Sequence, residues 1–290
     1  MTAKILDGAM VADGIFDIVR DAIDLYSFSD ICLHVIQVGD DPASSIYIRN
    51  KERACQKVGI QSVTHHIDED AEKHEIINLI KDLNSDDSVT GILVQLPLPD
   101  KFNELDVFEI TNTVKYNKDV DGFTVLNTGL LSLLGVGYNT NIVPCTPFGI
   151  LSMLKTYHIE TSGKHCVIVG RSDIVGKPMA QLMLNENATV TVCHSHTKNL
   201  KEICKQADIL VCAIGKPMFF NDEYVKDGAV VIDAGINRLD NGKLCGDVNF
   251  DVANDIASYI TPVPGGVGKT TIASLMLNCV QAKMLQCDCS

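Results

Sequence analysis

The sequence predicts an α/β protein with two domains. Its 290 residues are enough for two modest hydrophobic cores. In both halves, apolar segments of strand length alternate with segments of helical spacing, and a turn-rich stretch at residues 138–147 lies between the halves. Strands that alternate with helices form parallel sheets with covered faces, and ligands bind at the carboxyl ends of their strands.

The first half begins with a segment of helical spacing and then a buried strand. A further helix opens at Pro42, behind acidic residues that can cap it. Gln95 stands at the end of the last strand of this half, where a ligand crevice is expected. The predicted elements are helices over 7–26, from Pro42 and over 71–83, and strands over 31–38, 61–67 and 90–95.

The second half opens with an apolar strand from residue 165 that ends in a glycine turn and leads into a helix. Such a turn directs backbone N–H groups and a helix N-terminus toward an anion such as a pyrophosphate. The usual dinucleotide fingerprint is G-x-G-x-x-G. Here Gly170 begins the motif, Ser172 replaces its second glycine, and Gly176 comes one position late.

The next strand, over 188–193, runs into His194 and Ser195 without an Asp or Glu. An NAD site usually has a carboxylate there for the ribose hydroxyls, whereas an Arg accommodates the 2′-phosphate of NADP. Arg171, Ser172 and Ser195 offer one cation and two hydroxyls, so the pattern favours NADP. An ordinary strand–turn–helix with a surface Arg is the alternative. Strands over 208–214 and 229–235 and a helix over 270–286 complete this half.

Composition excludes several classes of protein. The formal net charge of −13 argues against a nucleic-acid-binding surface, and no apolar run has the length of a membrane span. The N-terminus lacks a secretory pattern, and most of the 11 cysteines lie in apolar segments without a Cys-x-x-Cys pair. We therefore expect a cytoplasmic protein with reduced thiols and no metal site. His194 and His196 have no carboxylate or Cys nearby at zinc spacing.

Two sets of polar residues could perform chemistry. Ser44, Tyr47 and Lys51 fall on one face of the helix that opens at Pro42. A Lys beneath an aromatic ring and near Gln95 could be desolvated and available for acid–base work, but from the spacing alone an ordinary surface Lys is favoured. Asp121, followed by glycine, could accept hydrogen bonds from a planar donor edge or could form an Asx turn.

The segment 264–271 resembles the phosphate loop of partition-type ATPases. The standard pattern needs a Gly where Val263 stands, and a nucleotide-binding domain should follow the loop. Only 19 residues follow this segment here. A glycine-rich loop that lines a pocket is therefore favoured, with an ATPase as the alternative.

Together these segments resemble the bifunctional methylenetetrahydrofolate dehydrogenase/cyclohydrolase family over nearly the whole chain. Six motifs in the family's order carry the resemblance, at residues 38–51, 91–99, 118–123, 144–147, 165–178 and 261–268. The resemblance implies a folate-binding catalytic domain over 1–140, joined by the C-terminal helix 270–286, and a Rossmann-type NADP domain over 141–269. It also implies a cleft between the two domains and a homodimer.

The resemblance further implies the reaction and its residues. NADP⁺ would oxidise 5,10-methylenetetrahydrofolate, and water would open the methenyl product to 10-formyltetrahydrofolate. Lys51 would serve the hydrolytic half, Gln95 would hold Lys51, Tyr47 would stack on the folate, and Asp121 would bind the pterin edge. The family's remaining contacts correspond to Pro264, Gly265 and Gly266 for substrate, and to Thr146, Gly170, Arg171, Ser172, Ser195 and Ile236 for NADP.

The chain departs from the family pattern at two places. Lys269-Thr270 stands where the family usually has Pro-Met, and Tyr116 stands where it usually has Pro. The first departure adds a charge near the expected pocket. Two further alternatives are a single-activity dehydrogenase, possibly NAD-linked, and a folate- or nucleotide-binding protein without turnover. Lys51 and Gln95 argue against the loss of hydrolysis, and Arg171 with Ser195 argues against NAD. Lys51, Gln95 and Asp121 together argue against a protein without turnover.

Overall fold

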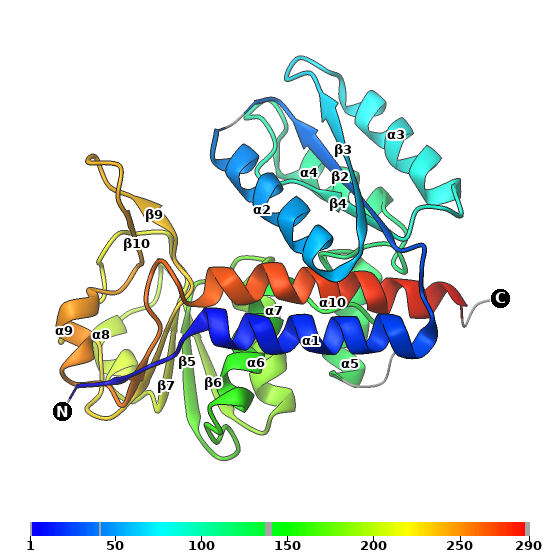
Figure 1. Cartoon of the computed structure of the whole chain (residues 1–290). Coiled ribbons are helices and arrows are strands. Elements are labelled where there is room, and N and C mark those ends of the chain that lie inside the picture. Colours follow the sequence, from blue (N-terminus) through cyan, green and yellow to red (C-terminus); the bar gives the residue numbers. More distant parts are fainter. Residues whose placement is uncertain (1, 41, 137–140, 288–290) are drawn as a thin grey trace. The chain divides into compact units, whose positions relative to one another are not determined.

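The computed structural model describes residues 2–40, 42–136 and 141–287, with the side chains of 42–46 left aside. The chain forms two compact units (Figure 1). Unit 1 comprises Met1–Gly14 and Cys145–Ser274, and unit 2 comprises Ile15–Pro144 and Leu275–Ser290. Helices α1 (Gly8–Tyr26) and α10 (Val267–Cys287) therefore contribute residues to both. No helix within the described residues is long and apolar enough to cross a bilayer.

Unit 2 is built on a parallel sheet in the order β3–β2–β4. The chain passes from β2 to β3 on one side and then places β4 on the other side of β2, so a switch point lies between β2 and β4. Ile92 of β4 forms a parallel bridge with Asp119, which extends the sheet by one short segment. The elements are β2 (Cys32–Val38), β3 (Gln61–Ile67), β4 (Gly91–Val94), α2 (Pro42–Val58), α3 (Lys73–Ser85), α4 (Glu104–Thr113) and α5 (Val125–Leu134).

The core of unit 2 lies where α3 and α4 cover this sheet. Ile76 and Ile80 of α3 are four residues apart and fully buried, as the helical period requires for one face. They pack with Ile36 of β2, Ile92 of β4 and Ile110 of α4 in one cluster. Strands buried on both sides explain why β2 and β4 are almost uniformly apolar.

Unit 1 contains a six-stranded parallel sheet in the order β1–β11–β8–β7–β5–β6. The strand order reverses at β5, since β6 lies on one side of it and β7 on the other. This is the Rossmann-type switch point, at which a dinucleotide crosses the carboxyl ends of the strands. The strands are β1 (Lys4–Ile5), β5 (His165–Val169), β6 (Thr189–Cys193), β7 (Ile209–Cys212), β8 (Val230–Asp233) and β11 (Tyr259–Ile260).

Shorter elements complete unit 1. Its helices are α6 (Cys145–Thr156), α7 (Gly176–Asn185), α8 (Leu200–Cys204) and α9 (Phe250–Asn254), and an antiparallel pair is formed by β9 (Asn237–Arg238) and β10 (Leu244–Cys245). Helix α6 begins inside the predicted turn-rich join, of which residues 138–140 lie outside the described part. Pro147 indicates a turn in the sequence, but it stands in the first helical turn, where N–H groups have no intrahelical acceptor.

The α/β fold class and its Rossmann-type second half are confirmed, and each of the seven predicted strands is present within a few residues. The domain boundaries 1–140, 141–269 and 270–286 remain a proposal. Residues 1–14 belong to unit 1, whereas the predicted boundary assigns them to the first domain. They lie there because β1 pairs with β11.

Side-chain amides attach the C-terminal half of α10 to unit 2. The amide nitrogen of Asn278 donates to the carbonyl oxygens of Val120 and Val143, both at 2.8 Å. Gln286 Nε2 donates in the same way to Thr90 at 2.8 Å and Asn117 at 2.9 Å. These bonds satisfy main-chain carbonyls next to the segment that leads to Asp121.

We predict that Asn278→Ala lowers the free energy of unfolding by about 2–3 kcal/mol, because it leaves two buried carbonyl oxygens without these donors. Urea unfolding followed by circular dichroism measures the change. Asn241→Ala, at an exposed turn, is the matched control and should leave the midpoint nearly unchanged. Equal midpoints for both variants would contradict the assignment.

Candidate functional site

Lys51 and Gln95 meet at the carboxyl edge of the unit 2 sheet. Gln95 directly follows β4, and its backbone N–H donates to Ile36 of β2 at 2.9 Å. Its side-chain Nε2 donates to the Leu96 carbonyl at 2.6 Å, which leaves Oε1 facing the other way. Lys51 Nζ, from α2, donates to that Oε1 at 2.8 Å. The predicted pairing of these two side chains is thus present.

Tyr47 lies one turn before Lys51 on α2 and is partly buried. Burial raises the pKa of its phenol, so the side chain presents an aromatic face and a neutral hydroxyl. Ser44, which the sequence places on the same face, has a side chain outside the described part.

Asp119 holds the loop in which Asp121 lies. The Asp119 side chain is buried and accepts hydrogen bonds from the N–H groups of Gly122 at 3.0 Å and Thr124 at 2.8 Å. Asn127 Nδ2 donates to it at 2.9 Å. A carboxylate with three such donors is occupied by the fold itself, so it is not the one available to a ligand.

Asp121 differs from Asp119 in its electrostatics. Burial raises the pKa of Asp121 to about 7, the negative charge of Asp119 adds to the rise, and the positive charge of Lys51 opposes it. The effect of Lys51 on Asp121 places the two groups within electrostatic reach of each other. Lys51 is hydrogen-bonded to Gln95 and acts electrostatically on Asp121, and a carboxyl group with a pKa near 7 is a candidate for proton exchange near neutral pH.

The glycine turn of unit 1 has no room for side chains. Gly170 has φ of 129°, and a Cβ there would lie 2.1 Å from the carbonyl oxygen of Ala213. A Cβ on Gly176 would lie 2.2 Å from the carbonyl oxygen of Gly170. Both positions thus require glycine, and the turn forms a narrow backbone cradle of the kind that admits a pyrophosphate.

Arg171 and Ser172 follow the end of β5, and Ser195 follows the end of the neighbouring strand β6. The N–H of Gly170 donates to the Cys193 carbonyl at 2.9 Å, which ties the end of β5 to the end of β6. All three side chains are exposed there. The cation and the two hydroxyls predicted for the cofactor thus stand at the ends of two adjacent strands.

Ser172 also explains the departure from the glycine fingerprint. Its Oγ accepts hydrogen bonds from the N–H groups of Val175 at 3.2 Å and Gly176 at 3.4 Å, at the start of α7. The hydroxyl thus satisfies N–H groups that would otherwise lack an acceptor at the helix start. This role depends on the loop conformation and is not evident from the spacing of the motif.

Thr146 contacts α10 at the first turn of α6. Its Oγ1 lies 3.1 Å from Thr271 Oγ1. One turn further along α6, a Cβ on Gly149 would come within 2.5 Å of Thr270 Oγ1, so the two helices approach closely. Thr270, the first residue after the added charge of Lys269, is fully buried in this contact.

The loop 264–266 packs on the start of α1. The carbonyl oxygen of its middle residue accepts a 3.0 Å hydrogen bond from the N–H of Gly8. Ile236 lies beside the loop's exit, 3.6 Å from where a Cβ on Gly268 would be. Lys269 is exposed on the first turn of α10. The glycines therefore permit close packing of main chain, as expected for a loop that lines a pocket.

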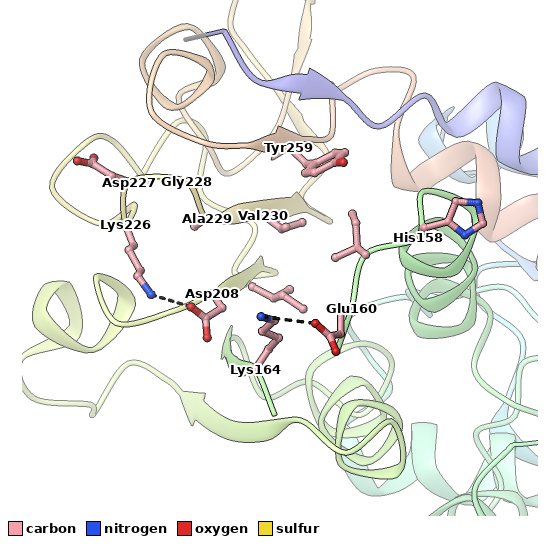
Figure 2. Close-up of a pocket in the computed structure, with 12 residues that line it drawn as sticks. His158, Glu160, Lys164, Asp208, Lys226, Asp227, Gly228, Ala229, Val230 and Tyr259 are labelled. Carbon is pink, nitrogen blue, oxygen red and sulfur yellow. Dashed lines mark hydrogen bonds and ion pairs between the residues drawn. The ribbon is translucent and has the colours of Figure 1, made fainter. Parts of the chain in front are cut away.

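A hollow of about 380 Å³ lies at the opposite end of the unit 1 sheet, beside the first residues of β7, β8 and β11. Figure 2 shows Lys226 directed toward Asp208 and Lys164 directed toward Glu160. Lys226 Nζ lies 2.6 Å from Asp208, and Lys164 Nζ lies 3.7 Å from Glu160. Ligands of parallel sheets bind at the carboxyl ends, so this hollow is not the dinucleotide site.

Sequence reasoning did not identify two buried carboxylates at the carboxyl edge of unit 1, Asp233 and Asp247. The available signals were weak. Asp233 ends an apolar strand, and Asp247 follows a glycine, a pattern that an ordinary turn also produces.

These features define a class of protein. A Rossmann-type sheet with a glycine cradle, together with a Lys–Gln–Asp site in a separate α/β unit, is the architecture of a dinucleotide-dependent enzyme. Comparison with known proteins identifies the family within this class. The tetrahydrofolate dehydrogenase/cyclohydrolase catalytic domain matches residues 6–121, and the NAD(P)-binding domain of the same family matches residues 144–287.

Individual proteins agree with this match. The bifunctional protein FolD of Agathobacter rectalis is 53% identical over 282 residues, which cover 97% of this chain and 99% of that protein. The crystal structure of the FolD dehydrogenase/cyclohydrolase from Campylobacter jejuni is 44% identical, with a TM-score of 0.91 over 97% of this chain and 99% of that one. The FolD of Trypanosoma brucei, complexed with NADP and an inhibitor, is 34% identical, with a TM-score of 0.90 over 98% of each chain.

The chain belongs to the tetrahydrofolate dehydrogenase/cyclohydrolase family. The resemblance found from the six motifs is confirmed, and so is the expectation of an enzyme with a nicotinamide dinucleotide cofactor.

We predict that Asp121→Asn stabilises the protein at pH 8 by about 1–3 kcal/mol, since the wild type must then keep an ionised carboxylate partly buried. A carboxyl group whose folded pKa is about 7 favours the native state at low pH, and this contribution is lost as the pH rises through 7. The difference between the variant and the wild type should therefore vanish near pH 4. Urea unfolding at both pH values measures it.

Asp119→Asn is the matched control. It removes the acceptor for three hydrogen bonds and should destabilise the protein at pH 8. An Asp121→Asn variant that loses stability at pH 8 to the same extent would contradict the distinction between the two carboxylates.

Proposed function

We propose that this chain oxidises 5,10-methylenetetrahydrofolate with NADP⁺ and then hydrolyses the product to 10-formyltetrahydrofolate. In the first step the bridging carbon loses a hydride, which yields the methenyl cation and NADPH. In the second, water adds to that carbon, one ring bond opens, and one proton is released. The observation that carries this proposal is the Lys51–Gln95 hydrogen bond beside Asp121, in a chain with both domains of the family.

Lys51 is assigned to the hydrolytic step. The methenyl substrate is itself a cation, and a second positive charge next to it is disfavoured, so the Lys51 amine is expected to be neutral when the substrate is bound. A neutral Nζ can take a proton from the attacking water. Its 2.8 Å hydrogen bond to Gln95 Oε1 fixes the amine in position and supports this assignment.

Folate recognition is assigned to Tyr47, Asp121 and the loop 264–266. The Tyr47 ring offers a face for stacking, and Asp121 offers two acceptor oxygens to the donor edge of the pterin. Asp121 accepts best when ionised, and in the free protein the positive charge of Lys51 favours that form. The loop would bring main chain close to the substrate, because its glycines carry no side chain.

The cradle at Gly170 and the cluster of Arg171, Ser172 and Ser195 are assigned to NADP, and Thr146 and Ile236 to the same cofactor. When bound, NADP⁺ supplies the acceptor for the hydride. The cradle would hold the pyrophosphate, and Arg171 with the two hydroxyls would hold the 2′-phosphate at the end of β6. The main contribution of the protein to hydride transfer is then to align the two carbons. A homodimer and a cytoplasmic location are further parts of this proposal.

We predict that Lys51→Met lowers the cyclohydrolase rate by about 100-fold or more, the contribution typical of a positioned acid–base group. The dehydrogenase rate should stay within about tenfold, because hydride transfer needs alignment rather than this amine. Separate assays of the two half-reactions test the difference. Lys57→Met, at an exposed position on the same helix, is the control and should change neither rate. Undiminished hydrolysis in Lys51→Met would refute the assigned role.

We predict that Arg171→Gln lowers kcat/KM for NADP⁺ by about 10- to 100-fold through loss of a charged hydrogen bond. The value for NAD⁺, which lacks the 2′-phosphate, should change little. Lys177→Gln is the control, since Lys177 is engaged with Asp173 at the surface. An equal loss with both dinucleotides would place Arg171 elsewhere in the cofactor site.

A further inference from the structure

Asp247 and Asp233 form a buried network at the carboxyl edge of the unit 1 sheet. Asp233 is the last residue of β8 and is 3% exposed, and Asp247 follows β10 and is fully buried. Neither carries a role in the function proposed above. Buried carboxylates are costly unless hydrogen bonds compensate them, so their partners show what they hold in place.

Asp247 fixes the loop that follows β7. Its carboxylate accepts hydrogen bonds from the N–H groups of Ile214 at 2.6 Å, Gly215 at 3.0 Å and Lys216 at 2.9 Å. Asn237 Nδ2, at the start of β9, donates to the same group at 2.9 Å. One side chain thus anchors two loops from different strands.

Asp233 in turn fixes Asp247. Its carboxylate accepts hydrogen bonds from the backbone N–H groups of Asp247 at 3.0 Å, Val248 at 2.8 Å and Gly235 at 2.9 Å. A Cβ on Gly235 would lie 2.2 Å from Asp247 Oδ1, and a Cβ on Gly246 would lie 1.8 Å from Asp233 Oδ2. Both glycines are therefore required for the carboxylates to reach the main chain.

The anchored loop follows β7, on the side of β5 where the nicotinamide half of a dinucleotide is expected. In this fold the adenosine ribose lies at the end of the second strand, here β6, and the pyrophosphate lies at the turn after the first, here β5. The remaining half must extend past β5 toward the ends of β7 and β8. The loop lies beside the glycine turn, because the carbonyl oxygen of Ala213 is 2.1 Å from where a Cβ on Gly170 would be.

Peptide geometry determines what this loop presents. In a trans peptide the C=O and N–H groups point in opposite directions, and the peptides at 213–216 are trans. Because the three N–H groups point to Asp247, the carbonyl oxygens of Ala213, Ile214 and Gly215 point away from it. The loop thus offers acceptors, and no N–H of these three peptides, on the face opposite the carboxylate.

We propose that Asp247, held by Asp233, is a positioning residue for hydride transfer: it fixes the carbonyl oxygens of residues 213–215 as acceptors for the hydrogen-bond donors of the nicotinamide carboxamide. This inference rests on the proposed use of NADP. It predicts that loss of Asp247 disturbs the nicotinamide half of the cofactor and leaves the adenosine half in place.

The test compares three ligands in the wild type and Asp247→Asn by equilibrium binding. They are NADP⁺, its 3-acetylpyridine analogue, which carries a methyl group where the carboxamide has its NH₂ donor, and 2′-phospho-ADP-ribose, which lacks the ring. The wild type should prefer NADP⁺ to the analogue by about 5- to 10-fold, the effect of one hydrogen bond. The variant should lose this preference and bind 2′-phospho-ADP-ribose as before.

Kinetics supply a second measurement. The dehydrogenase kcat of Asp247→Asn should fall by about 10- to 100-fold, because the ring is no longer aligned. The ratio of dehydrogenase to cyclohydrolase rates should fall with it, since hydrolysis uses no dinucleotide. Asp240→Asn, at an exposed position in the same region, is the control. Asn237→Ala, which removes one donor of the network, should shift the ligand preference in the same direction and replaces Asp247→Asn if that variant does not fold.

Two outcomes would overturn the inference. One is a variant that keeps the wild-type preference for NADP⁺ over the analogue. The other is an equal weakening of all three ligands and both half-reactions, which would show a merely structural role. Failure of the proposed function is distinguishable, because the wild type itself would then neither bind NADP⁺ nor reduce it.

Discussion

Both units depend on hydrogen bonds from main-chain N–H groups to buried carboxylates. Strand ladders end at the carboxyl edge of a parallel sheet, and the loops that continue from it must be held by other means. Asp119 does this in unit 2, and Asp247 with Asp233 does it in unit 1. A charged acceptor bonds N–H groups more strongly than a neutral one, and the cost of its burial is compensated only when several donors converge on it.

Asp121 shows the converse arrangement two residues from Asp119. Asp119 anchors the loop through its hydrogen bonds. Asp121 is buried without a comparable set of hydrogen-bond donors among the described residues, and this burial raises its pKa to about 7. Such a group lowers stability at neutral pH but is available to a ligand and to Lys51. Functional sites commonly sacrifice stability in this way. At Gly170 there is likewise no side chain, so main-chain groups of the turn stay available to an anion.

Much of the fold could be predicted from sequence because its strands are buried runs with regular helices between them. The glycine turn and the absence of an acid after the 188–193 strand were also local signals. Lys51 was different, since its spacing alone favours an ordinary surface Lys, and only the family resemblance predicted its hydrogen bond to Gln95. The anchors Asp233 and Asp247 could not be predicted, because Asp247 bonds N–H groups more than 30 residues earlier in the chain. Such long-range partners leave no periodic pattern.

The central claim is that one chain couples NADP⁺ reduction to hydrolysis of the product. The most direct test measures NADPH and 10-formyltetrahydrofolate in the same reaction of the wild-type protein with 5,10-methylenetetrahydrofolate, run in parallel with NADP⁺ and NAD⁺. The account predicts equal amounts of the two products and much faster turnover with NADP⁺. Accumulation of the methenyl compound without enzymatic opening, or equal turnover with NAD⁺, would contradict it.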